Sequence, residues 1–276
     1  MGLAPHPTKE LFEKSSLESQ KLKYEFLQRK VERTYSSKEL ASKFFGGMEP
    51  FSKERFHKPN PMTRLILVRH GQSLANAGLI FAGHSDFDLS ELGHKQAALL
   101  AEYLVAHEKI TAIYSSDLLR AYHTATPTAE RLLLPVVTDQ VLREIYAGEW
   151  DGRTFSDIET IFADDFRVWR EDFSHARPTG GESVPEVYRR VVPKILELCR
   201  RHDGETILMT THATVVRALH AYANGFSDDE MGKVAFCGNA AMNLFEIDAT
   251  TIRELDYDVD VHLGDLATAV PKKLNV

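Results

Sequence analysis

Short apolar runs alternate with segments of helical periodicity along most of the chain. The apolar runs predict strands over Arg64–Val68, Thr111–Ser115, Pro135–Thr138, Thr206–Thr211 and Ala241–Ile247, and an edge strand over Ile252–Tyr257. Apolar residues three and four positions apart predict helices over Ser90–His107, Leu118–Leu134, Val184–Arg201 and Thr214–Ala223. Because each helix must cover a sheet face, this alternation favours an α/β fold, a three-layer α/β/α sandwich around a mostly parallel sheet.

The first 61 residues follow a different pattern. Their apolar positions recur at helical spacing, at Leu17, Tyr24, Leu27, Val31 and Tyr35. We therefore expect an N-terminal helical extension over residues 1–61 and a main domain over residues 62–276. Basic and acidic residues are mixed along the extension, which favours packing on the main domain or on a second copy over binding to a membrane. A homo-oligomer formed through the extension stays open.

The charge of the chain limits its partners. A formal net charge of -7 argues against nonspecific attraction to a nucleic-acid backbone. Residues 1–61 carry 12 Lys and Arg against 8 Asp and Glu, a net of +4, which leaves -11 for the rest. If such an acidic body binds an anion, the fold must gather positive charge into a few arginines, and those near strand ends are the first to consider.

Membrane and secretory signals are missing from the pattern. No run approaches the roughly 20 apolar residues that a membrane span needs, and the first ten residues lack the apolar stretch of a secretory signal. The two cysteines, Cys199 and Cys237, form no Cys-x-x-Cys pair and suggest no disulfide framework. The expectation is a soluble cytoplasmic protein without a membrane partner.

Three predicted strands lead into polar residues of related kind. Arg69 and His70 follow the first strand, Arg120 follows the second after one short turn, and His212 follows the strand before the last predicted helix. The carboxyl ends of neighbouring parallel strands lie at one edge of a sheet. We therefore expect these side chains to converge.

Phosphoryl transfer is the chemistry that would use this set. Arginine donates bidentate hydrogen bonds to phosphate and stays charged. A neutral imidazole is a nucleophile near pH 7, and neighbouring arginines favour its uncharged form, which makes His70 the candidate nucleophile. His212 precedes the helix Thr214–Ala223, so a phosphate beside it would also meet free backbone N–H groups.

A departing alkoxide needs a proton, and the water that hydrolyses a phosphohistidine must lose one. One carboxyl group can serve both steps. Glu144 is the preferred candidate, because it follows a strand-like segment and precedes a glycine-punctuated loop. Glu149 and Asp151 are weaker alternatives.

The ordered motifs resemble a known family. The first is Arg69-His70-Gly71-Gln72-Ser73, followed by Asn76, Gly83, Asp86, Leu89-Ser90 and Gly93. The others are Ser115-Ser116-Asp117-Leu118-Leu119-Arg120-Ala121, Leu142-Arg143-Glu144, Gly180-Gly181-Glu182-Ser183 and Thr211-His212-Ala213. Together they span residues 64–247 and are similar to the histidine phosphatase superfamily, the phosphoglycerate mutase-like proteins.

This resemblance implies roles for the matched residues. It implies that His70 is phosphorylated, that Arg69, Arg120 and His212 complete the phosphate pocket, and that Glu144 is the proton donor. It also implies substrate-binding positions at Asn76, Gly83 and Ala213. Neither a metal nor a cofactor is implied, and residues 62–276 become the expected catalytic domain.

The phosphatase branch of that family matches better than the mutase branch. Mutases place a tyrosine three residues after the acid and a lysine further on, whereas this chain has Ala147 and Phe155. Ala82 also replaces a threonine before Gly83. The predicted function is metal-independent hydrolysis of a small phosphorylated metabolite, and a mutase or a phospho-ligand binding module without turnover remains the alternative.

Other phosphate chemistries fit less well. Asp86 and Asp88 form an Asp-x-Asp pair, but no apolar strand precedes them as magnesium-dependent phosphatases require. Neither cysteine has an arginine six positions later, and there is no Gly-x-x-x-x-Gly-Lys loop. The acids at Asp256, Asp258 and Asp260 read as the solvated face of an edge strand rather than a metal site.

Substrate choice is expected to depend on a cap over the pocket. The segment Phe155–Ser174 is the candidate cap, and its recognition residues are predicted to be Phe166, Arg167, Trp169 and Arg170. Phe81 and His84 are further candidates.

Overall fold

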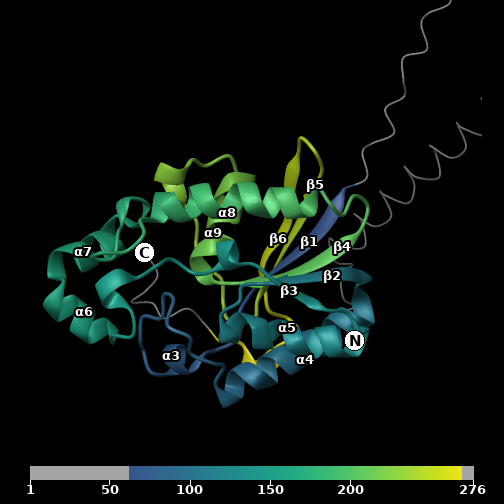
Figure 1. Ribbon diagram of the computed structural model, residues 1–276, viewed down its shortest axis with the longest axis horizontal. Coiled ribbons are helices and arrows are strands. Elements are labelled where there is room, and N and C mark those ends of the chain that lie inside the picture. The colour runs from purple at the N-terminus through teal and green to yellow at the C-terminus, as the bar shows by residue number, and fades with distance from the viewer. Residues whose placement is uncertain (1–61, 269–276) are drawn as a thin grey trace, which may run out of the picture. The chain divides into compact units, whose positions relative to one another are not determined.

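The computed structural model describes residues 62–268, so the expected extension over residues 1–61 lies outside the described residues. Within this range the strands form one sheet in the order β3-β2-β4-β1-β5-β6 (Figure 1). The strands are β1 Thr63–Arg69, β2 Ile110–Ser115, β3 Val136–Thr138, β4 Thr206–Thr211, β5 Met242–Ile247 and β6 Ile252–Val259. The first four are mutually parallel, and β5 and β6 add an antiparallel edge.

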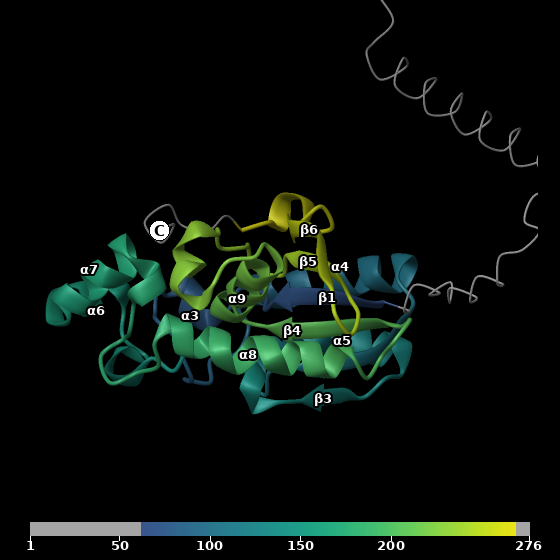
Figure 2. The same ribbon diagram turned by 90° about the horizontal axis from the view of Figure 1, so that it is seen from above.

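Helices cover both faces of this sheet. They are α3 Leu74–Ala77, α4 Glu91–His107, α5 Leu119–Leu132, α6 Phe155–Ile161, α7 Ala163–Glu171, α8 Val184–Cys199 and α9 Ala213–Ala223. Figures 1 and 2 show α4 and α5 on one side of the sheet, α8 and α9 on the other, and α6 and α7 projecting beyond one end. The predicted three-layer sandwich with a mostly parallel sheet is confirmed.

The central strand β1 is buried on both faces. Leu65 and Leu67 pack into the core under α8 and α9, while Ile66 and Val68 pack into the core under α4 and α5. Alternate side chains of a strand point to opposite faces, so a continuous apolar run is what a strand covered on both sides requires. This strand ends at Arg69, which places the following residue at the edge of the sheet.

Serine caps define where two of the long helices begin. The Ser90 side chain accepts a hydrogen bond from the Gly93 amide at the start of α4, and Ser183 forms a capping box with Glu186 at the start of α8. Ser183 belongs to the Gly180–Ser183 motif, which therefore starts a helix. Both helices lie within a few residues of their predicted bounds.

The segment Phe155–Ser174 contains α6 and α7, for which the sequence pattern predicted no secondary structure. Phe166 and Trp169 of α7 are buried with Trp150 in the core. Trp150 contacts both rings edge to face, at centroid distances of 5.9 and 5.8 Å. Aromatic packing against the main domain thus holds this pair of short helices.

The edge strand β6 is confirmed. Its acidic residues Asp256 and Asp258 are exposed, as expected for a solvated face. Among residues 62–268, no helix is long and apolar enough to cross a bilayer. Cys199 and Cys237 are both unpaired and buried.

Candidate active site

The three predicted strand ends meet at the carboxyl edge of the sheet. The His70 amide donates to the Thr211 carbonyl at 2.8 Å, and the Ser116 amide donates to the Thr210 carbonyl at 3.0 Å. These two bonds continue the pairing of β4 with β1 and β2 beyond the strands themselves. The loops that carry His70, Ser116 and His212 are therefore in mutual register, and the predicted convergence is confirmed.

His70 presents one defined ring nitrogen for chemistry. It is 4 % exposed, and its Nδ1 lies 2.7 Å from the Gly71 carbonyl oxygen. Since a carbonyl only accepts, Nδ1 carries the proton of the neutral ring and Nε2 is left with its lone pair. Burial, together with the charges of Arg120 and Arg69, lowers the pKa of His70 well below its ordinary value of 6.5. The ring is thus held in a neutral, nucleophilic form.

His212 is oriented in the opposite sense. The two imidazole rings lie edge to face with centroids 5.2 Å apart, and His212 Nε2 lies 2.8 Å from the Ser116 hydroxyl. That hydroxyl oxygen also accepts from the Leu118 amide, so its proton is available to His212 Nε2. This assigns the ring proton to Nδ1, which is buried and has no hydrogen-bond partner in the described part of the chain. Such a donor suits an incoming oxyanion.

Arg120 is the most deeply buried cation of the site. It is 1 % exposed, and its guanidinium donates to the carbonyls of Ser85, Ala82 and Gly83 at 2.8 to 3.0 Å. Burial lowers the pKa of Arg120 to about 10, which leaves the group charged at neutral pH. Arg69 donates from Nη1 to the Cys237 carbonyl at 2.6 Å. Two positive charges are thereby fixed beside the imidazoles.

The Glu144 carboxylate lies at the amino end of α9. It accepts from the amide of Ile145 at 2.9 Å and, more weakly, from that of Thr214 at 3.3 Å. The weaker alternatives differ in place: Asp151 accepts from the backbone of the 84–85 loop, and Glu149 is exposed. Glu144 alone of the three lines the pocket.

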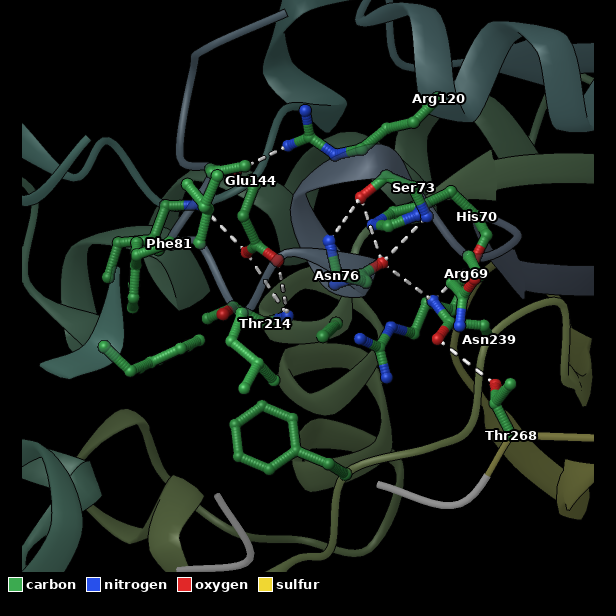
Figure 3. Close-up of a pocket in the computed structure, with 18 of the residues that line it drawn as sticks. Arg69, His70, Ser73, Asn76, Phe81, Arg120, Glu144, Thr214, Asn239 and Thr268 are labelled. Atoms are coloured by element: carbon green, nitrogen blue, oxygen red, sulfur yellow. Dashed lines mark hydrogen bonds between the residues drawn. The ribbon is translucent and has the colours of Figure 1, made fainter. Parts of the chain in front are cut away.

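These groups surround a cavity of about 190 Å³. Figure 3 shows Glu144 and Phe81 on one side of it and Arg69, His70 and Asn239 on the other. Of the expected substrate-binding positions, Asn76 and Ala213 line the cavity and Gly83 does not. Gly83 instead packs so closely on Ala147 that an added Cβ would lie 2.5 Å from the Ala147 methyl, and its carbonyl holds Arg120.

The model of one protein family matches residues 65–259, and its description is the histidine phosphatase superfamily, branch 1. The chain belongs to this superfamily. Its phosphatase side is indicated by relatives that carry phosphatase names, and the chain is a phosphoric monoester hydrolase of the histidine phosphatase type.

Two curated relatives and one solved structure illustrate the similarity. Phosphoserine phosphatase 1 of Hydrogenobacter thermophilus is 33 % identical over 213 residues, which cover 77 % of this chain and 100 % of the relative. Glucosyl-3-phosphoglycerate phosphatase of Mycolicibacterium vanbaalenii is 35 % identical over 185 residues, covering 64 % and 81 %. The structure of Bacillus stearothermophilus YhfR superposes with a TM-score of 0.69 at 29 % identity and covers 73 % of this chain and 99 % of that one.

Sequence reasoning did not identify several polar residues of this histidine phosphatase site. Asn239 donates to the His70 carbonyl at 3.1 Å and to Asn76 Oδ1 at 3.2 Å, and Thr268 donates to Asn239 Oδ1 at 3.2 Å. Ser116 was seen only as part of a motif, although it sets the tautomer of His212. The Gly-Asn loop that contains Asn239 was the available signal, but nothing local links it to a histidine 169 residues away.

The predicted cap residues need correction. Trp169 and Phe81 line the cavity, as does Phe155. Phe166 is buried in the core, and Arg167 and Arg170 are exposed and paired with Glu171 and Glu159. Among the described lining residues, α7 contributes an aromatic ring and no arginine. His84 bonds through Nε2 to the Glu144 carbonyl and does not line the cavity.

Ser116→Ala should lower kcat/KM by about tenfold, the equivalent of one lost hydrogen bond of ~1.4 kcal/mol, because His212 would lose the group that sets its tautomer. Ser115→Ala is the matched control, since Ser115 is equally buried and bonds to the Ser116 carbonyl and to Thr210 instead. Initial rates at equal folded fractions measure the effect. Equal losses in both variants would exclude the tautomer role.

Imidazole titration should separate buried from exposed histidines. His70 and His212 both have a lowered pKa, so they should stay neutral as the pH falls through 6.5, whereas Asp172 raises the pKa of exposed His175, which should gain its proton above 6.5. Because only the unfolded chain then protonates the buried pair, stability should fall as the pH drops below 6.5. Nitrogen-15 spectra of the imidazoles measure the first effect and urea unfolding the second. A midpoint near 6.5 for His70 would contradict the geometry.

Proposed function

We propose that this chain hydrolyses a small-molecule phosphomonoester through a phosphohistidine on His70, without a metal ion, and with Glu144 as general acid and base. The observation that carries the proposal is the bond from His70 Nδ1 to the Gly71 carbonyl. It leaves Nε2 unprotonated on a buried ring that lines the cavity. The small cavity suits a small metabolite.

In the first step, His70 Nε2 attacks phosphorus and forms the P–N bond while the ester P–O bond breaks. The departing alkoxide oxygen takes a proton from Glu144. Arg69, Arg120 and the His212 Nδ1–H stabilise the charge on the three equatorial oxygens. The amide Nδ2 of Asn76 is a further donor, because its Oδ1 already accepts from Ser73 and Asn239.

In the second step, a water molecule attacks phosphorus and gives its proton to Glu144. The P–N bond breaks, Nε2 recovers its lone pair, and inorganic phosphate leaves. The carboxylate returns to its protonated form, so each turnover uses one water and leaves the enzyme unchanged. Two fixed guanidinium groups and the amino end of α9 supply the charge stabilisation that a metal ion would otherwise provide.

Two cavity residues favour hydrolysis over mutase activity. Phe155 lines the cavity where the mutase branch has a lysine, and Ala147 is buried against Gly83 where that branch has a tyrosine. Neither can bind a second polar group of a phosphorylated acid. A non-catalytic phospho-ligand module is the remaining alternative, and it would bind phosphate without turning over an ester.

His70→Ala should abolish both turnover and covalent labelling. Wild-type protein, mixed with a radiolabelled ester in EDTA and quenched in base, should carry an acid-labile phosphoryl group, and the variant should carry none. His202→Ala is the control, because His202 lies at the opposite end of β4, bonded to Tyr114. Normal hydrolysis by folded His70→Ala would overturn the mechanism, and EDTA-sensitive labelling would overturn metal independence.

Glu144→Gln should slow hydrolysis according to the leaving group. For benzyl phosphate, whose alkoxide needs a proton, a loss of about 10²-fold to 10⁴-fold is expected, and for 4-nitrophenyl phosphate the first step should lose less than about tenfold. Both esters carry one aromatic ring, so binding is similar. Burst kinetics isolate the first step. An equal loss for both esters would remove Glu144 from the acid role.

A further inference from the structure

The cavity has a different character away from the phosphate-binding groups. Aromatic side chains from three separate segments line it: Phe81, Phe155, Trp169 and Phe236. Neutral polar groups, Asn239 and Thr268, line another part. Figure 3 places Phe81 across the cavity from Asn239 and Thr268, so the organic part of a substrate would lie between an aromatic wall and a hydrogen-bonding rim.

The aromatic wall is preorganised by its own packing. The Phe81 ring contacts Phe155 and Trp169 edge to face, at centroid distances of 5.7 and 5.1 Å. Phe81 and Trp169 are both buried, and Trp169 in turn contacts Phe173 at 5.0 Å. A wall already held in place loses little entropy when it binds a ligand, so its apolar surface contributes to affinity.

Phe236 is held from behind by a buried cation. The Arg217 guanidinium carbon lies 4.3 Å from the Phe236 ring centroid and 4.0 Å from the Phe173 centroid, between the two rings. Stacking of this kind fixes the ring plane. Arg217 itself does not line the cavity, so its charge serves the wall rather than a ligand.

Every cation among the described lining residues is committed to the phosphate end. The arginines are Arg69, which donates to one backbone carbonyl, and Arg120, which donates to three. The carboxylate of Glu144 also faces the cavity. A substrate carboxylate against the aromatic wall would therefore lose its hydration without gaining a partner, and it would face a like charge.

We propose that the substrate is the phosphate monoester of an uncharged organic group with a flat apolar face, such as an aryl or aryl-bearing alcohol, and with a neutral hydrogen-bonding group opposite that face. This inference rests on the proposed function and narrows its substrate class. It separates this chain from enzymes named for phosphoserine or glucosyl-3-phosphoglycerate, since both of those molecules carry a carboxylate.

A pair of esters that differ mainly in charge tests the proposal. The full-length chain is assayed with 3-carbamoylphenyl phosphate and 3-carboxyphenyl phosphate, which match in shape and in the position of the leaving phenol. The carbamoyl ester should have a kcat/KM at least about tenfold higher, because only the carboxylate must be desolvated unpaired. It should also be preferred to phosphoserine.

A pair of variants tests the wall. Phe155→Ala should raise KM for 1-naphthyl phosphate several-fold more than for inorganic phosphate as an inhibitor, since phosphate does not reach the wall. Phe226→Ala is the control: Phe226 is also half-buried, but it follows α9 and does not line the cavity. Identical changes in the two variants would overturn the role of the aromatic wall.

The outcomes separate the two proposals. Failure to hydrolyse any ester would overturn the proposed function itself. Hydrolysis with equal or better kcat/KM for the carboxylate ester or for phosphoserine would leave the proposed function standing and overturn the substrate class. Because the assay uses the full chain, a cation contributed from outside residues 62–268 would appear as that carboxylate preference and would also count against the inference.

Discussion

A guanidinium removed from water must be hydrogen-bonded on several sides, and the site is organised around this requirement at Arg120. Three backbone carbonyls of residues 82–85 accept its protons, so the loop after α3 is drawn to the start of α5. The same charge lowers the pKa of both catalytic imidazoles and attracts an anion. One buried cation thus links the position of a loop, the protonation of two histidines and the affinity for phosphate.

The sheet supplies the rigidity that this arrangement needs. His70, Ser116 and His212 each stand directly after a strand, and backbone bonds to the Thr210 and Thr211 carbonyls hold the first two in register with β4. Each imidazole is then oriented by a single further contact, a carbonyl for His70 and a hydroxyl for His212. Opposite tautomers follow, one suited to attack and one to donation.

Chemistry and substrate choice are assigned to different parts of the chain. Groups on strand ends bind the phosphoryl group, whereas the aromatic wall comes mainly from the 79–82 loop, the α6–α7 segment and the loop at Phe236. Changes in those segments can alter the organic part that is bound without moving His70 or Arg120. This division explains how similar cores carry names for quite different phosphorylated substrates.

The sequence by itself determined the layered fold and the core of the site, because strand periodicity and residues just after strands are local properties that the sheet brings together in one way. Arg69, His70, Arg120, Glu144 and His212 could be found on that basis. The tertiary structure alone decided that Arg167 and Arg170 face solvent while Trp169 lines the cavity, since helical spacing does not say which face a short helix buries. It also decided the roles of Ser116 and Asn239, whose partners lie 96 and 169 residues away and leave no local trace in the chain.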